Sequence, residues 1–313
     1  MPIDFQIPHA VNPSRGGDAE VLHFRGCALR MPPCGHINQG VPLKLNLNDV
    51  LPFRNIFGKT PDERRPSRLL MLLEGRALLE FSTLPLALPW LMSRVPKGDG
   101  HAVLVLPGMM ADDNSTIPLR RFLASRGYQT SGWGQGPNLG PRRGVLTQLR
   151  QTLADLHAQS GRKVSIVGWS LGGVYAREMA RESPGKVRQA ISLGSPLYGH
   201  PDSSSNASQL YKFVSGRNDV DPGERGDGPP PGVPMTAIFT RADGIVGWGC
   251  SIEKKGPLSD NIEIVGASHS GLGVHPLALY AIGDRLAQSE DGWKHFKPTG
   301  PERALYPAES PSR

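Results

Sequence analysis

The stretch Lys163-Val-Ser-Ile-Val-Gly-Trp-Ser-Leu-Gly-Gly173 decides the fold. A β-branched run at 164–167 leads straight into the pattern Gly168-x-Ser170-x-Gly172, and a helix-like stretch follows at 174–180. Strand, sharp turn and helix in this order form a nucleophile elbow, a strained turn that lifts a serine hydroxyl clear of the sheet. A Cβ at either flanking glycine would collide with the packed strand and helix. We therefore expect Ser170 to be a nucleophile, and an ordinary serine in a Gly-rich turn is the alternative.

The predicted base is a histidine on a loop after a late strand. Residues 261–265 are typical of a strand, and the loop Gly266-Ala-Ser-His-Ser-Gly271 follows, with His269 in it. A histidine in this position suits the chain order Ser, Asp, His. Of the other late histidines, His275 is better placed to begin an apolar helix, and His295 lies in a polar tail. His269 is therefore the predicted base, with a surface loop histidine as the alternative.

The predicted acid is Asp243. Residues 235–240 are typical of a buried strand, and Arg241-Ala-Asp-Gly244 follows directly. A carboxylate at the end of this strand would hold the imidazole tautomer and stabilise the imidazolium that forms during attack. An ordinary Asp-Gly turn is the alternative. Asp219 and Asp221 are rivals, but no strand precedes them in their Pro- and Gly-rich stretch.

Two backbone amides are expected to form an oxyanion hole. The segment 101–106 is typical of a buried strand and ends in Pro107-Gly108-Met109. In a fold with a nucleophile elbow, the residue after the nucleophile and one from an early strand–helix loop supply the N–H donors. The predicted donors are Leu171 and Met109, and Gly108 would let the loop backbone come close to the reacting atoms.

Three tryptophans are candidates for an apolar pocket that takes an acyl chain. They are Trp133 in a glycine-rich loop, Trp169 beside the serine, and Trp248 after the predicted acid. Packing in the core or under a lid is an equally good interpretation, because large aromatic side chains dominate both kinds of contact.

The order of elements predicts the fold class. Strands and helices alternate from about residue 98 to 290, which indicates an α/β domain with a mostly parallel central sheet and helices on both faces. The stretch 199–233 breaks this alternation, and we expect a small lid or a surface loop there. We further expect an irregular N-terminal extension at 1–66, a helical lead-in at 67–97 whose helix ends near Phe81, and a C-terminal tail at 291–313.

Charge and composition narrow the functional classes. The 313 residues carry a net charge of +7, but the basic residues are scattered, so we expect a solvated basic surface and no nucleic-acid binding. The three cysteines make no disulfide framework, and neither a metal nor an organic cofactor is implied. Because neither a signal peptide nor a spanning segment is evident, we expect a cytoplasmic protein, with peripheral membrane contact open through the helix at 67–81. The sequence leaves the oligomeric state open.

The chain resembles the α/β-hydrolase superfamily, and within it the lipase-like and GPI-inositol-deacylase-like serine esterases. The resemblance covers about residues 98–290, and the motifs that carry it are Leu106-Pro-Gly-Met109, Val167-Gly-Trp-Ser-Leu-Gly-Gly173, Ile191-Ser-Leu-Gly-Ser-Pro196, Ala242-Asp-Gly244 and Ser268-His-Ser-Gly-Leu272. It implies Ser170 as nucleophile, Asp243 as acid and His269 as base. It also implies the amides of Met109 and Leu171 as oxyanion donors. Pro107-Gly108 stands where many lipases have His-Gly, so no narrow substrate class follows.

The expected activity is hydrolysis of carboxylic esters, as an esterase or lipase, on a small-molecule or lipid substrate and through an acyl-enzyme. An acyltransferase with the same triad is one alternative, since the two differ only in whether water or an alcohol reaches the acyl-enzyme. A lipid deacylase at a membrane surface is another. A non-catalytic binding protein on the same fold is disfavoured, because it would normally lack one member of the triad.

Overall fold

The computed structural model describes residues 65–308 and 311, except for 143, 199–204 and 207–230. All of these residues belong to one compact unit, Leu45–Arg313. The N-terminal extension and most of the expected lid therefore lie outside the described residues, as do the rival acids Asp219 and Asp221.

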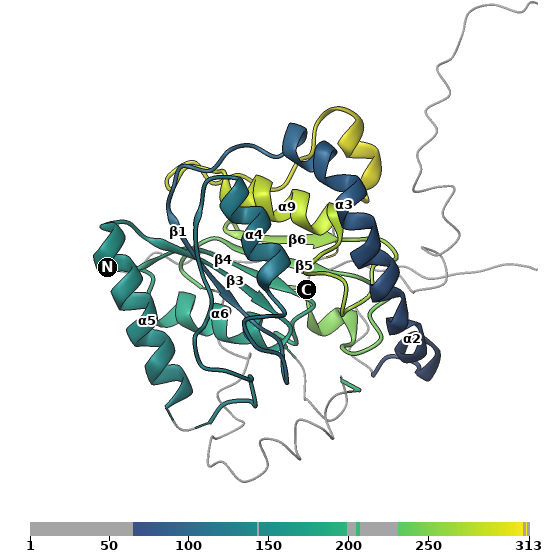
Figure 1. Cartoon of the computed structure of the whole chain (residues 1–313), viewed down its shortest axis with the longest axis horizontal. Coiled ribbons are helices and arrows are strands. Elements are labelled where there is room, and N and C mark those ends of the chain that lie inside the picture. The colour runs from purple at the N-terminus through teal and green to yellow at the C-terminus, as the bar shows by residue number, and fades with distance from the viewer. Residues whose placement is uncertain (1–64, 143, 199–204, 207–230, 309–310, 312–313) are drawn as a thin grey trace, which may run out of the picture. The chain divides into compact units, whose positions relative to one another are not determined.

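The described residues form one six-stranded sheet with the order β2-β1-β3-β4-β5-β6 (Figure 1). Every neighbouring pair runs parallel. The strands are β1 (Ala102–Leu106), β2 (Gln129–Ser131), β3 (Val164–Trp169), β4 (Val187–Leu193), β5 (Met235–Phe239) and β6 (Ser259–Glu263). The central strands are buried on both faces, which explains why their sequences are near-continuous apolar runs.

Helices cover both faces of this sheet, as Figure 1 shows. Alternate residues of β1 point to opposite faces, because the side-chain period of a strand is two. Val103 and Val105 pack in a cluster with α3 (Ala77–Arg94), α4 (Ile117–Ser125) and α9 (Pro276–Leu286). Leu104 and Leu106 pack in a second cluster with α5 (Val145–Ser160) and α6 (Leu171–Glu182). The predicted fold class, a parallel sheet between two helical layers, is confirmed.

The lead-in helix is longer than the sequence suggested. It begins as α2 (Arg68–Leu72), tightens into the 3-10 turn η2 (Leu73–Arg76) and continues as α3 to Arg94. The expected end near Phe81 is therefore wrong. Pro85 and Pro89 lie inside α3, but both are exposed, so the carbonyl groups that they leave without a helical donor lie on the solvent side.

The far end of α3 is anchored by the C-terminal part of the chain. The ring of Trp90 stacks on Tyr280 of α9, with 5.5 Å between ring centroids. Arg94 pairs with Glu302 at 2.8 Å, in the 3-10 helix η5 (Gly300–Leu305). A further short 3-10 helix, η4 (Trp248–Cys250), follows the loop after β5. No helix among the residues that the structure describes has both the length and the apolar composition needed to cross a membrane.

Candidate active site

Four neighbouring strands bring the residues of the candidate site to one edge of the sheet. Ser170 follows β3, Gly194 follows β4, Asp243 lies on the loop after β5, and His269 lies on the loop after β6. Strands β3, β4, β5 and β6 are adjacent and parallel, so the loops at their carboxyl ends converge. This edge of an open α/β sheet is where such folds bind ligands.

The turn at Ser170 is strained in the way a nucleophile elbow requires. Ser170 has φ 52° and ψ −120°, a region that residues with a side chain rarely adopt. A Cβ on Gly168 would lie 2.2 Å from the carbonyl oxygen of Gly172, and one on Gly172 would lie 2.4 Å from that of Leu106. The steric reason predicted for the two glycines is therefore confirmed. The Ser170 amide donates to the Leu193 carbonyl at 2.8 Å, which ties the turn to β4.

The structure brings Ser170, His269 and Asp243 into one hydrogen-bonded chain. Nδ1 of His269 donates to Oδ2 of Asp243 at 2.8 Å, and Nε2, left as the acceptor, lies 3.0 Å from Ser170 Oγ. The other carboxylate oxygen, Oδ1, accepts from the amides of Ile245 and Val246 at 2.8 and 2.7 Å. The buried carboxylate is thus fixed through both oxygens, and its position sets the orientation of the imidazole ring.

The environment of His269 favours its protonated form. Burial disfavours an imidazolium, but the Asp243 charge and hydrogen bond outweigh burial, and Glu74 adds to them. The net result is a pKa for His269 above its ordinary value. A ring of this kind is well suited to take a proton from Ser170 and to carry the charge while the reaction proceeds.

Gly194 is a site residue that sequence reasoning missed. It has φ 55°, and a Cβ there would lie 3.0 Å from His269 Nδ1 and 3.2 Å from Asp243 Oδ2. Only glycine leaves room behind the His–Asp pair at this point. Its position directly after β4, on a strand between those of the serine and the acid, is the signal that could have identified it.

The loop after β1 lies beside Ser170, as the oxyanion prediction requires. A Cβ on Gly108 would lie 3.2 Å from the Cβ of Ser170. The buried Asn138, which sequence reasoning missed, holds this loop in place. Its side-chain NH₂ donates to the Pro107 carbonyl at 2.9 Å, and its backbone carbonyl accepts from the Met110 N–H at 2.7 Å. Met110 has φ 63°, so the loop stores strain as well. The donor roles of Met109 and Leu171 stay predictions.

The three predicted pocket tryptophans lie in different surroundings. Trp169 is half-buried beside Ser170, and its indole N–H donates to the His269 carbonyl at 3.1 Å. Trp133 is buried in the core and donates to the Gly136 carbonyl at 2.7 Å. Trp248 packs in a small cluster, stacked on Phe239, with the Arg241 guanidinium 4.0 Å from its ring centroid. Binding of substrate by each of them stays a prediction, and Trp169 has the most direct contact with the triad loops.

Three charged side chains of the lead-in helix also contact the site, and nothing in the sequence pointed to them. Glu74, Arg76 and Glu80 all form hydrogen bonds with the loops that carry Asp243 and His269. In sequence they look like the polar face of a core helix. They lie 166 to 196 positions from their partners, so no local pattern could have found them.

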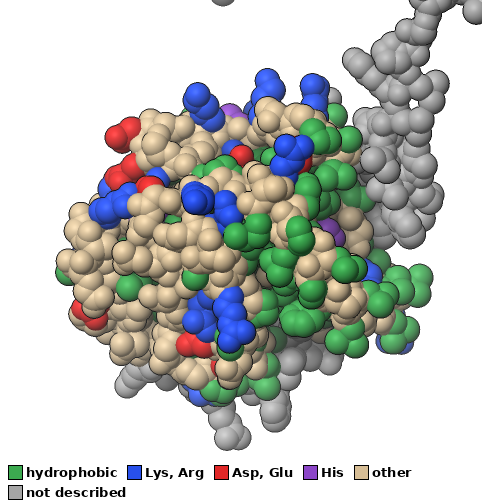
Figure 2. Space-filling view, turned by 45° about the horizontal axis from the view of Figure 1, so that its top comes forward, with side chains coloured by type: hydrophobic (Ala, Val, Ile, Leu, Met, Phe, Trp, Pro, Cys, Tyr) green, Lys and Arg blue, Asp and Glu red, His purple; other side chains and the backbone are tan. Residues whose placement is uncertain are grey.

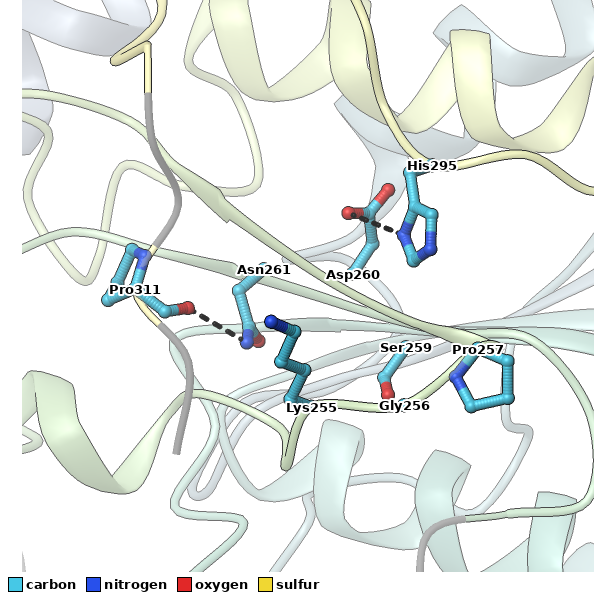
Figure 3. A pocket seen from close by; sticks show the side chains of 8 residues that line it. All are labelled: Lys255, Gly256, Pro257, Ser259, Asp260, Asn261, His295 and Pro311. Atoms are coloured by element: carbon cyan, nitrogen blue, oxygen red, sulfur yellow. Dashed lines mark hydrogen bonds and ion pairs between the residues drawn. The ribbon is translucent and has the colours of Figure 1, made fainter.

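The remaining late histidines lie elsewhere, as expected. His275 is the N-cap of α9 and accepts from the Leu277 amide at 3.3 Å, and burial lowers its pKa to about 4. His295 lies 3.5 Å from Asp260. His295 and Asp260 line a hollow of about 520 Å³ at the start of β6, with Asn261 beside them (Figure 3). This hollow is at the amino end of β6, whereas the His269 loop follows its carboxyl end, so it is not part of the site.

No group of three or more His, Cys, Asp or Glu side chains within the described ranges is arranged to hold a metal ion. The buried polar groups of the site are engaged with one another, as the Ser–His–Asp chain shows. The chemistry that this arrangement can perform is proton transfer from a serine hydroxyl and attack by its oxygen.

Comparison with known proteins adds a likeness of fold. No family model and no curated protein matches the chain. Among solved structures, lipase B of Aspergillus fumigatus is 17% identical with a TM-score of 0.49, over 64% of this chain and 57% of the lipase. A monoacylglycerol lipase of Paleococcus ferrophilus is 16% identical with a TM-score of 0.42, over 60% and 96%. The lipase BlEst2 of Bacillus licheniformis is 14% identical with a TM-score of 0.44, over 62% and 94%.

The chain therefore spans little more than half the length of the Aspergillus lipase that it resembles. Its own architecture defines the class: a parallel sheet between two helical layers, with a strained serine turn after β3, an aspartate after β5 and a histidine after β6. The protein has the α/β-hydrolase fold.

Proposed function

We propose that the protein is a serine hydrolase that cleaves carboxylic esters. The observation that carries this proposal is the hydrogen-bonded chain from Ser170 through His269 to Asp243, set on a strained turn at the carboxyl edge of the sheet. A serine, a base in hydrogen-bond reach and a third group that orients the base are the signature of an activated nucleophile.

The reaction begins when Ser170 Oγ attacks the ester carbonyl carbon and its proton passes to Nε2 of His269. Asp243 stabilises the resulting imidazolium and keeps Nδ1 protonated. The carbonyl oxygen becomes an oxyanion, which the amides of Met109 and Leu171 stabilise in this proposal. Loss of one such donor typically costs about 10²- to 10³-fold in turnover.

The tetrahedral intermediate then collapses, and the bond to the alcohol oxygen breaks. The leaving alcohol takes the proton from His269, which leaves an ester between Ser170 and the acyl group. Water then attacks the acyl carbon while His269 takes its proton; the bond to Ser170 Oγ breaks, His269 returns the proton to Oγ, and the carboxylic acid product is released. If an alcohol takes the place of water, the same steps make a new ester, so product analysis with a competing alcohol identifies the acceptor.

A fluorophosphonate probe tests the nucleophile. We expect the probe to label the wild-type protein on Ser170, and Ser170→Ala to abolish the label. Ser160→Ala is the matched control and should label normally, because Ser160 ends α5 and precedes the amino end of β3, whereas Ser170 follows the carboxyl end of that strand. Undiminished labelling of Ser170→Ala would refute the assignment.

A surface feature favours lipid esters as one class of substrate. The lead-in helices carry ten of the twelve large apolar side chains that are exposed among the described residues, which Figure 2 shows as one green region. Leu72 is 80% exposed and Leu86 83%. A helical face with this much exposed apolar area suits contact with a lipid surface. The same helices contact the loops of the proposed triad, so a lipid surface there would lie near the site.

This part of the proposal is tested with a chain-length series of p-nitrophenyl esters, measured with and without anionic phospholipid vesicles. We expect vesicles to raise the activity on long-chain esters, and a Leu72→Asp/Leu86→Asp variant to lose that rise while it still cleaves short soluble esters. Leu258→Asp, before β6, is the control with a similar change elsewhere. Equal behaviour of the double variant and the wild type with vesicles would contradict the lipid-surface role.

A further inference from the structure

The carboxylate of Glu74 lies between the two loops that carry the acid and the base. Its Oε1 accepts from the amide of Gly244, directly after Asp243, at 2.9 Å. The same oxygen accepts from the amide of His269 itself at 3.0 Å. Oε2 accepts from the amide of Ser270 at 2.9 Å. One side chain thus holds the acid loop and the base loop at a fixed separation.

The close approach of the helix to the acid loop depends on glycine. A Cβ on Gly244 would lie 2.4 Å from the carbonyl oxygen of Leu70 in α2 and 2.9 Å from Cγ of Glu74. Gly244 therefore allows the helix backbone to pack against the loop and brings Glu74 within reach of its amide.

Two neighbouring charges bind the same loops. Arg76 donates to the carbonyl groups of Ala242 and Ala267 at 2.6 and 2.7 Å, so it also joins the acid loop to the base loop. Glu80 accepts from the amide and the hydroxyl of Ser268 at 2.8 and 2.9 Å. Arg76 lies 3.7 Å from Glu80. The three side chains form one polar cluster, of which only Glu74 bonds the histidine residue itself.

The pKa values of the two carboxylates in the cluster are shifted in opposite directions. Burial raises the pKa of Glu80 above its ordinary value, and its hydrogen bonds from Ser268 and the charge of Arg76 do not offset this. Burial acts on Glu74 in the same direction, but the three backbone N–H donors and the His269 charge lower its pKa below the ordinary value. Glu74 is therefore the carboxylate that is held ionised as pH falls.

The ionised Glu74 acts on the base through its charge. The groups that set the pKa of His269 are Asp243, hydrogen-bonded to Nδ1, and Glu74, on the backbone side of the same residue. Both negative charges stabilise the imidazolium and oppose the effect of burial. Ser170, on the Nε2 side, is neutral, and Arg76 and Glu80 face the backbone of the loop.

We propose that Glu74 is a positioning residue for the Ser–His–Asp chain: its carboxylate joins the acid loop to the base loop and supplies a second negative charge beside the base. This inference rests on the proposed function for its effect on turnover. It assigns Glu74 no contact with substrate. The turn of the lead-in helix that carries Glu74 accordingly helps to position the acid and base loops.

The test compares Glu74→Gln with the wild type on a short soluble p-nitrophenyl ester across a pH series. Glutamine keeps the size but loses the charge, and its NH₂ group faces an amide donor in place of one carboxylate oxygen. We expect kcat to fall at least about 10-fold, because small displacements of a reacting group are costly. KM should stay near the wild-type value, because Glu74 touches no substrate. The acidic limb of the profile should move to lower pH, because the imidazolium has lost a stabilising charge.

An NMR titration of the His269 ring provides a readout that needs no activity. We expect the His269 pKa to be lower in Glu74→Gln than in the wild type. Glu74→Asp keeps the charge but is one methylene too short to bond both loops, so its kcat should fall while its His269 pKa stays closer to the wild type. Glu182→Gln, whose carboxylate pairs with Arg150 at the surface, is the control for a simple Glu-to-Gln change and should alter neither quantity.

A Glu74→Gln protein with wild-type kcat and an unshifted His269 titration would overturn the proposal. Glu74→Asp decides the positioning role if Glu74→Gln does not fold, because wild-type kcat in the aspartate variant would contradict it. A wild-type protein without esterase activity would refute the proposed function, whereas the NMR comparison would still decide the effect of Glu74 on His269.

Discussion

Replacement of Gly194 by alanine separates backbone strain from displacement of the triad. Gly194 has φ 55°, and a left-handed conformation costs a residue with a side chain about 1–2 kcal/mol. The new methyl group would lie 3.0 Å from His269 Nδ1 and 3.2 Å from Asp243 Oδ2, closer than nearly all contacts of a Cβ. The His–Asp pair must therefore shift by a few tenths of an ångström, and its hydrogen bond to Ser170 must change. We expect kcat to fall by about 10- to 100-fold, since a 1 Å misplacement costs about 10²-fold.

The matched control is Gly161→Ala. Gly161 is the C-cap of α5 with φ 62°, and a Cβ there has nothing within 4 Å, so this variant has the same strain without the contact. Both variants should lose thermal stability to a similar extent, about 2–4 °C for each kcal/mol in a domain of this size. Only Gly194→Ala should lose activity in a steady-state esterase assay. Wild-type kcat for Gly194→Ala, with the expected loss of stability, would refute the reasoning.

Three further predictions concern the base, the acid and the loop beside Ser170. Because the pKa of His269 is raised and the base must be neutral to act, kcat/KM should fall with decreasing pH around a midpoint above about 6.5, and a profile that stays flat to pH 4 would contradict this role. Asp243→Asn should lower kcat by about 10⁴-fold through loss of the correct tautomer, and a loss below 10-fold in the same assay would argue against Asp243 as the acid. Asn138→Ala leaves the Pro107 carbonyl without its donor, so the free energy of unfolding, measured by chemical denaturation, should fall by about 1–3 kcal/mol, and kcat should fall as well. Unchanged values of both would contradict the support of this loop by Asn138.

The central strands and the elbow could be predicted because their signals are local. The β-branched run before Gly168 and the glycines around Ser170 satisfy steric demands within ten residues of chain, and the structure shows the contacts that make them necessary. The loops of Asp243 and His269 could be proposed for a related reason. Each follows a short apolar run, and parallel strands end at one edge of a sheet.

Features that depend on contacts between distant parts of the chain could not be predicted in this way. Gly194 is constrained by two side chains, at 243 and 269, that only the folded sheet brings near it. Glu74 receives its hydrogen bonds from residues at least 170 positions away, and the sequence around it indicates only a helix. The extent of that helix was also missed, because the usual effect of Pro85 and Pro89 is relieved where both face solvent.

The covalent intermediate tests the central claim most directly. The wild-type protein is mixed with a slowly hydrolysed p-nitrophenyl ester, quenched with acid during turnover and digested for mass spectrometry. We predict that the peptide with Ser170 gains the mass of the acyl group, and that His269→Ala does not accumulate this adduct on the same timescale. Continued ester cleavage with Ser170 unmodified throughout, or undiminished cleavage by Ser170→Ala, would contradict the account.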